Sequence, residues 1–169
     1  LKDKGFDFYA LNVSRGVNGL VGDIGLIFKL KAIISDLNPA IIHNLNPKPV
    51  LYGSLLTLLI QLMNNQKKIL IINSFPGLGR LYGDTSIIYS LFKIIFENIY
   101  RFVSKSSKVK SVFQVSSDRE YFLNKKIISR QSSFVIKGSG VDTSKFYSKN
   151  KVRKINNINV LMASRITAE

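Results

Sequence analysis

Short hydrophobic runs alternate along the chain with longer segments in which apolar residues recur every third or fourth position. The short runs are typical of strands, and the longer spacing is typical of helices that cover a sheet. We predict strands over residues 6–13, 40–43, 68–73, 110–115, 132–136 and 158–163, and helices over residues 23–37, 50–64, 85–105 and 118–125. This order predicts an α/β fold, a Rossmann-like parallel sheet flanked by helices.

Local signals place several boundaries. Asn38-Pro39 ends the first helix, and the uninterrupted apolar run over 40–43 is the kind of strand that is buried on both faces. Ser117 and Glu120 have the spacing of a capping box, so we expect a helix to begin at Asp118. Residues 74–84 form a glycine-rich loop.

The pattern divides the chain into three parts. Residues 1–142 predict one Rossmann-like domain, and residues 143–157 are polar and basic, which is typical of a linker. Residues 158–169 then begin a second domain, because the strand over 158–163 has no visible partner. The first residues have neither a start methionine nor an apolar leader, so we expect sequence to be missing before them.

The composition of the chain excludes several kinds of functional site. The absence of cysteine excludes disulfides, zinc knuckles and thiol nucleophiles, and it is compatible with a cytoplasmic location. His43 is the single histidine, which argues against a His-rich metal site and against a catalytic triad within this chain. We therefore expect no bound metal.

The net charge of +15, from 25 Lys and Arg against 10 Asp and Glu, predicts an anionic partner. Nucleic acid, the anionic inner leaflet of a membrane and diphosphate-bearing substrates all fit, and a general bias toward Lys, Ile and Asn explains part of the charge. Helix 85–105 is apolar enough to meet a bilayer or a lipid-linked acceptor. We favour its burial against the sheet.

The loops that follow the strands combine basic residues with glycines. Ligands of open α/β sheets bind at the carboxyl ends of the strands, and phosphate groups need both charge and close approach to the backbone. The Gly77-x-Gly79 pair lacks the rest of a dinucleotide or P-loop motif, so ATP- and NAD-dependent chemistry is unsupported. The candidate residues in these loops are Arg15, His43, Asn46, Lys48, Gly77, Gly79, Arg80, Gly138, Ser139 and Gly140.

Four segments carry a resemblance to a known family. They are Ile41-Ile42-His43-Asn44-Leu45-Asn46-Pro47-Lys48-Pro49-Val50-Leu51-Tyr52-Gly53-Ser54, Ile72-Asn73-Ser74-Phe75-Pro76-Gly77-Leu78-Gly79-Arg80, Phe113-Gln114-Val115-Ser116-Ser117-Asp118-Arg119, and Gly138-Ser139-Gly140-Val141-Asp142 followed by Phe146. In sequence and spacing they resemble the family 4 retaining glycosyltransferases, in particular bacterial enzymes that extend undecaprenyl-diphosphate-linked sugars. The resemblance extends over almost the whole chain.

The resemblance implies a GT-B enzyme whose N-terminal domain binds the acceptor and whose C-terminal domain binds a nucleotide-sugar co-substrate, without metal or cofactor. It implies acceptor contacts from Arg15, His43, Asn46, Lys48, Gly77, Gly79 and Arg80, and it places Gly138, Ser139 and Gly140 beside the interdomain cleft. Arg165 matches the family's donor-phosphate arginine. No catalytic residue can be assigned.

Two departures limit what the resemblance implies. Many members have a second histidine where this chain has Leu45, so an imidazole is not expected to act there. The family's first strand, glycine loop and helix are also missing, and the donor domain is cut short. We therefore expect the 169-residue chain to be inactive by itself.

The expected function is transfer of a sugar, with retention of configuration, to a lipid-linked or glycan acceptor in surface polysaccharide assembly, at the inner face of the cytoplasmic membrane. One alternative is a basic nucleic-acid-binding α/β module, which a basic stripe across a sheet or helix face would favour. Basic residues at the carboxyl ends of the strands would favour the enzyme. A GT-B sugar-nucleotide epimerase is the other alternative, with Asp84, Asp118 and Asp142 as its available acids.

Overall fold

A computed structural model of the chain describes residues 5–11, 23–63, 68–138 and 140–147. The chain separates into two units, Leu1–Gly138 and Ser139–Glu169. Within the second unit, the Asp142 carboxylate accepts hydrogen bonds from the hydroxyl and the backbone N–H of Ser144, at 2.6 and 3.0 Å. These bonds lower the pKa of Asp142. The predicted linker therefore begins with a turn, and the predicted strand over 158–163 lies outside the described residues.

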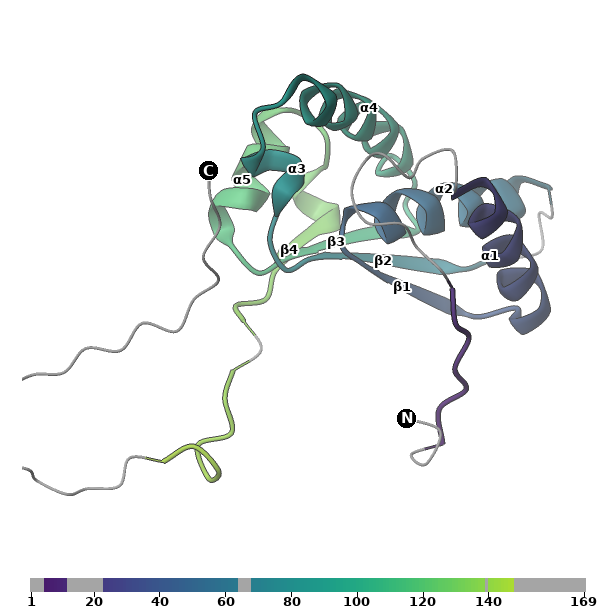
Figure 1. Cartoon of the computed structure of the whole chain (residues 1–169), viewed down its shortest axis with the longest axis horizontal. Helices are drawn as coiled ribbons and strands as arrows, with labels where there is room; N and C mark the ends of the chain where they lie inside the picture. Colours follow the sequence, from purple (N-terminus) through teal and green to yellow (C-terminus); the bar gives the residue numbers. More distant parts are fainter. Residues whose placement is uncertain (1–4, 12–22, 64–67, 139, 148–169) are drawn as a thin grey trace, which may run out of the picture. The chain divides into compact units, whose positions relative to one another are not determined.

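The first unit is a four-stranded parallel sheet with helices packed on it, which confirms the α/β prediction (Figure 1). The strands lie in the order β1-β2-β3-β4. The elements are α1 (Asp23–Leu37), β1 (Ile41–Leu45), α2 (Pro47–Met63), β2 (Leu70–Phe75), α3 (Arg80–Gly83), α4 (Ile87–Val103), β3 (Val109–Phe113), α5 (Ser116–Asn124), the 3-10 turn η2 (Arg130–Ser132) and β4 (Ser133–Val135).

The described helices lie on one face of this sheet (Figure 1). Each strand is followed by a crossover to the next strand on the same side, and such crossovers are almost always right-handed, so successive helices stack on a single face. Burial alternates accordingly: Asn44 is buried, whereas Ile41 and Leu45 are more than half exposed. The prediction that 40–43 is buried on both faces is therefore wrong for the described part of the chain.

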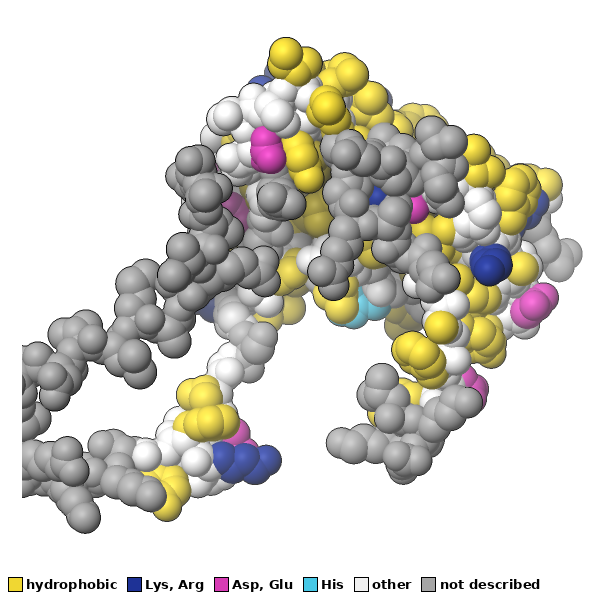
Figure 2. All heavy atoms as spheres, viewed as in Figure 1, with side chains coloured by type: hydrophobic (Ala, Val, Ile, Leu, Met, Phe, Trp, Pro, Cys, Tyr) yellow, Lys and Arg dark blue, Asp and Glu magenta, His cyan; other side chains and the backbone are white. Residues whose placement is uncertain are grey.

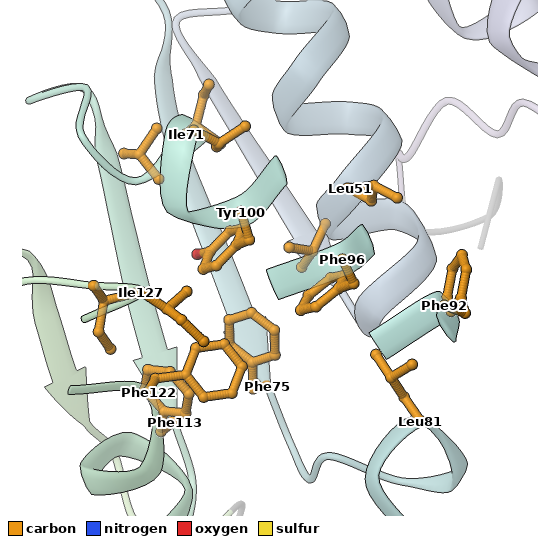
Figure 3. Close-up of a cluster of buried hydrophobic side chains, with 14 residues drawn as sticks. Leu51, Ile71, Phe75, Leu81, Phe92, Phe96, Tyr100, Phe113, Phe122 and Ile127 are labelled. Carbon is orange, nitrogen blue, oxygen red and sulfur yellow. The ribbon is translucent and has the colours of Figure 1, made fainter. Parts of the chain in front are cut away.

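An aromatic cluster fixes α4 and α5 to the middle of the sheet (Figure 3). The Phe75 ring stacks on Phe113 at 4.9 Å between centroids and meets Phe122, Tyr100 and Phe96 at 5.3, 5.5 and 6.4 Å. Each such pair contributes about 1 kcal/mol beyond the burial of its area. The expected burial of helix 85–105 is thus confirmed for one face of α4.

A smaller cluster holds α1 against α2. Ile34, Ile60 and Ile69 are buried together, with Leu30 and Ile42 partly buried beside them. The apolar spacing predicted α1 with both of its boundaries, because its Asn38-Pro39 stop is a strong local signal. Asn38 itself takes a left-handed φ of 42°.

The predicted strand over 6–13 is not a strand in its described part, residues 6–11. Phe6 and Phe8 are each 61% exposed. A strand requires a hydrogen-bonded neighbour, and none of the four described strands pairs with this segment. The short apolar run by itself therefore misidentified this segment as a strand.

Several other helix and strand boundaries differ from the prediction because of local features of the chain. Strand β1 continues to Leu45, and α2 begins at Pro47 because proline is compatible with the first turn of a helix, where its missing N–H costs nothing. The capping box is wrong, because α5 begins at Ser116 and no side chain caps it. The glycine-rich loop contains the additional short helix α3.

Candidate functional site

The loops after β1 and β2 meet at the carboxyl edge of the sheet. Leu45 lies beside Ser74 in the strand register, and the Asn46 N–H donates to the Ser74 carbonyl oxygen at 3.3 Å. Asn46 has φ = 74°, a left-handed conformation that asparagine adopts more readily than most residues. This turn directs the chain from β1 into α2, where the Val50 N–H donates to the Asn46 carbonyl oxygen at 3.0 Å.

His43 is the central residue of β1 rather than the end of a strand. Its Nε2 lies 2.7 Å from the Ser74 hydroxyl oxygen, and which of the two atoms donates depends on the imidazole tautomer. Because its neighbour Asn44 is buried beneath the helices, the exposed His43 side chain lies on the opposite face of the sheet. The structure therefore pairs His43 with Ser74, a partner that the sequence did not predict.

Lys48 lies in the first turn of α2, not in a loop between prolines. Its Nζ forms an ion pair of 2.9 Å with the carboxylate of Asp23, at the start of α1, and the Tyr52 hydroxyl donates to the same oxygen at 2.9 Å. Burial and the neighbouring carboxylate raise the pKa of Tyr52 above its usual range. An anionic ligand at Lys48 would share this ammonium group with Asp23.

Gly77 and Gly79 follow β2 in the second loop of this edge. Gly79 has φ = 54°, and its carbonyl oxygen accepts the N–H groups of Tyr82 and Gly83 at 3.1 Å, so this glycine begins α3. A Cβ at either glycine would meet no described atom within 4 Å, which leaves open space above the loop. Arg80 starts α3, and its side chain is outside the description.

Of the remaining predicted site residues, the structure describes Gly138, three residues after β4, and Gly140 in the second unit. Gly138 and Gly140 have positive φ values of 53° and 67°, as turns require. Arg15, Ser139 and Arg165 lie outside the described residues, so their predicted roles stay predictions.

A row of buried polar side chains crosses the sheet beneath the helices. The strand register aligns Asn44 with Asn73, Asn73 with Ser111, and Ser111 with Ser133, and all four are buried. The Asn44 amide donates to the Asn73 Oδ1 at 2.9 Å. Sequence reasoning missed this row, although an asparagine inside each of two apolar strands was a visible signal.

Helices α2 and α4 complete the hydrogen bonding of this row. The Ser54 hydroxyl donates to Asn73 Oδ1 at 2.9 Å, and the Asn73 amide donates to the Tyr100 hydroxyl at 3.2 Å. The Tyr100 and Ser111 hydroxyls are 2.7 Å apart, and burial raises the pKa of Tyr100 to about 12. Because each member has a partner, the row fixes the register of three strands rather than offering a site for a ligand.

A second polar cluster joins α3, α4 and α5. The Tyr121 hydroxyl donates to the nearly buried Glu97 carboxylate at 2.8 Å, and the Lys93 Nζ lies 4.9 and 5.5 Å from the centroids of Tyr82 and Tyr121. Burial, with the nearby Glu97 charge, raises the pKa of Tyr82, and burial raises that of Tyr121 to about 12. The Lys93 ammonium group therefore makes cation–π interactions with both tyrosine rings.

The three acids that the epimerase alternative required come from different parts of the chain. Asp84 accepts the Ser86 N–H at 2.9 Å beside α3, Asp118 lies in α5 with its pKa raised by burial, and Asp142 belongs to the second unit. Among the residues that the structure describes, no group of three His, Cys, Asp or Glu side chains has the arrangement of a metal site. No helix in the described ranges is long and apolar enough to cross a membrane.

Several described basic residues lie at the amino-terminal edge of the sheet, opposite the candidate loops. Lys105 and Lys108 immediately precede β3, and Lys126 and Arg130 precede β4. Basic residues at the carboxyl ends of the strands are the arrangement that would favour the enzyme. Basic residues do follow strands at the carboxyl edge: Lys48 after β1, paired with Asp23, Arg119 in the first turn of α5 after β3, and Lys137 after β4.

Comparison with known proteins adds no family to this geometry, because no protein-family model and no curated protein sequence matches the chain. The α/β fold therefore rests on the structure itself, and any statement of function rests on the residues at the carboxyl edge of β1 and β2.

Proposed function

We propose that this chain is the acceptor-binding part of a retaining glycosyltransferase of the GT-B type. The acceptor is a lipid-linked or glycan chain, with an undecaprenyl-diphosphate-linked sugar as the first choice, and the co-substrate is a nucleotide-sugar. Neither metal nor cofactor enters the proposal. It rests on the resemblance of the loop sequences and on the α/β fold that the structure describes.

The observation that carries the proposal is the junction of two loops at the carboxyl edge of β1 and β2, the position where open α/β sheets bind ligands. Asn46 and Ser74 join the loops through the backbone, and a Cβ at Gly79 in the second loop would meet no described atom within 4 Å. At this edge the candidate contacts for a polar acceptor are the His43–Ser74 pair on strands β1 and β2 and Lys48 in the first turn of α2. These are hydrogen-bonding groups suited to sugar hydroxyls and to a diphosphate.

The donor side of the proposed reaction would involve Arg165, and Gly138 to Gly140 would border the interdomain cleft. Without a metal, the departing nucleotide diphosphate must be neutralised by Arg, Lys and backbone amides. That requirement supports a role for Arg165 as a donor-phosphate contact. The proposal places the enzyme at the inner face of the cytoplasmic membrane, where polyprenyl-linked acceptors are found.

The test is transfer of radiolabelled sugar by the full-length protein, whatever its extent beyond this chain. A panel of nucleotide-sugars is offered with undecaprenyl-diphosphate-linked acceptors, and label is followed into the lipid extract. We expect transfer with at least one pair, and a marked loss in the His43→Ala variant but not in Lys29→Ala on α1. Loss of all transfer across the panel, together with tight, salt-sensitive binding of DNA or RNA, would replace the enzyme by the nucleic-acid-binding alternative.

An epimerase would give a different result in the same assay. It would convert the nucleotide-sugar without any acceptor, and the label would remain in the water-soluble fraction as a stereoisomer of the donor. Chromatography of the nucleotide-sugar pool separates this outcome from transfer.

A further inference from the structure

Helix α4 presents an apolar stripe away from the core, interrupted by the exposed Asn98. Ile87, Leu91, Ile94 and Phe102 recur at spacings that place them on one face of the helix, with Ile88 and Ile95 beside them. Ile87 is 86% exposed and Phe102 is 63% exposed. Figure 2 shows hydrophobic side chains along the top of the molecule, over α4.

The exposure of this stripe does not result from poor packing of α4 on the sheet. The opposite face of α4 carries Phe92, Phe96, Tyr100 and Val103, all buried in the aromatic cluster. The helix is therefore seated firmly on the sheet, and it remains strongly apolar on the face that it turns to solvent. A helix that needed only to cover the sheet would carry polar residues there.

A basic hollow of about 340 Å³ adjoins the carboxyl-terminal end of the stripe. Arg101, Lys105 and Lys126 line it, together with Ser104 and Ser129. The Arg101 guanidinium is held in place by hydrogen bonds to the Asn98 side chain at 2.6 Å and to the Lys125 carbonyl oxygen at 3.3 Å. Arg101 is one residue from the exposed Phe102, so apolar surface and positive charge are contiguous.

We propose that the α4 stripe docks on an anionic lipid bilayer and that the hollow lined by Arg101, Lys105 and Lys126 receives a lipid phosphate. An interfacial helix enters the boundary between headgroups and acyl chains with its apolar face, while neighbouring basic residues meet anionic headgroups. The inference deepens the membrane location included in the proposed function, but it does not depend on sugar transfer.

Charge complementarity selects the bilayer among the partners that an apolar stripe could bind. A second copy of this chain would bring the same basic hollow, and the net charge of +15 opposes such pairing. Nucleic acid would be attracted by the hollow but would leave six large aliphatic and aromatic side chains in water. An anionic membrane satisfies both features at once.

The experiment is flotation of the 169-residue protein with vesicles of phosphatidylcholine containing about a third phosphatidylglycerol, compared with vesicles of phosphatidylcholine alone. The vesicles contain no polyprenyl lipid and no sugar donor, so failure of the transferase proposal leaves this result unaffected. We expect binding to the anionic vesicles that weakens as salt is raised, because salt screens the basic contribution.

The stripe is tested with Leu91→Gln combined with Ile95→Gln. The matched control is Ile24→Gln combined with Phe28→Gln, two exposed apolar residues at the same four-residue spacing on α1. The stripe variant should bind anionic vesicles about tenfold or more weakly, whereas the control should bind like the wild type. Far-UV circular dichroism and urea midpoints check that both variants fold.

The hollow is tested with Lys105→Gln combined with Lys126→Gln, against Lys29→Gln combined with Lys31→Gln on α1. Each basic residue near the surface contributes about fivefold, so the hollow variant, which removes two, should lose about 25-fold in affinity for the anionic vesicles. The α1 control has the same net charge and should lose much less.

Three outcomes would overturn the inference. One is a stripe variant that folds and binds vesicles as the wild type does. Another is equal loss in the hollow variant and its α1 control, which would mean that only net charge matters. The third is wild-type protein that ignores vesicles but self-associates in analytical ultracentrifugation, or binds RNA, through the same residues.

Discussion

Replacing Gly53 with alanine tests the buried polar row through a single methyl group. Gly53 lies within α2, and a Cβ placed on it would be 2.2 Å from Oδ1 of Asn44 and 2.8 Å from its Cγ. Real carbon atoms do not approach so closely, so Asn44 must move. Its amide group donates to Asn73 Oδ1 at 2.9 Å, and the Asn44 side chain is buried.

The expected cost follows from three effects. Overpacking a tight core position costs about 1–3 kcal/mol, and displacing the Asn44 amide from its buried acceptor costs about 1–3 kcal/mol more. Alanine recovers about 1 kcal/mol, because glycine is a poor residue inside a helix. The net prediction is a destabilisation of about 3 kcal/mol.

Urea unfolding followed by circular dichroism measures this change, with tyrosine fluorescence as a second probe because the chain contains no tryptophan. Gly25→Ala is the matched control. Gly25 also lies in a helix, α1, but a Cβ there meets nothing within 4 Å. That variant should be stabilised by about 0.5–1 kcal/mol.

A double variant isolates the contact between Gly53 and Asn44. In an Asn44→Ala background the obstructing side chain is gone, so adding Gly53→Ala should cost nothing or stabilise slightly. The reasoning is refuted if Gly53→Ala alone stabilises the protein as the Gly25 control does. It is equally refuted if the cost of Gly53→Ala is the same with and without Asn44.

Three further predictions concern buried groups. Tyr100→Phe removes the hydroxyl that links Asn73 to Ser111, and we expect a loss of about 1–2 kcal/mol in urea unfolding. Asp23→Asn leaves the Lys48 ammonium group without its carboxylate, and we expect a loss of about 3 kcal/mol; a change below about 0.5 kcal/mol would contradict a structural ion pair. The folded state holds the Tyr100 proton more tightly than the unfolded state, because its pKa is about 12 rather than 10.0. The protonated Tyr100 hydroxyl therefore contributes roughly 3 kcal/mol to the free energy of unfolding. This contribution is fully present below pH 10 and is lost as the pH rises through 12. Urea midpoints between pH 9 and 12 should therefore fall more steeply in the wild type than in Tyr100→Phe.

The order of strands and helices could be read from the sequence, because it depends on local patterns. Apolar residues every third or fourth position, with the Asn38-Pro39 stop, predicted α1 with both of its boundaries. The same local reasoning failed for residues 6–11, which form an apolar run but pair with none of the four described strands. It also failed for Ser117 and Glu120, whose capping spacing is not used at the start of α5.

The candidate loops could likewise be predicted, but their contacts could not. That a glycine loop follows β2 is visible in the residues. That Lys48 meets Asp23 across 25 positions, or that His43 meets Ser74 across 31, depends on how distant segments are brought together. These contacts change the interpretation of Lys48, since its charge is shared with a buried carboxylate.

The sequence by itself determined the α/β class, because the period of its apolar residues is set by the geometry of each strand and helix. Only the tertiary structure decided which face of each helix and of the sheet is buried. It buried one side of α4 in the aromatic cluster and left Ile87 and Phe102 in solvent, and it aligned Asn44, Asn73 and Ser111 in one row. Burial and register are properties of neighbours distant in the chain, and a local pattern carries no information about which neighbours those will be.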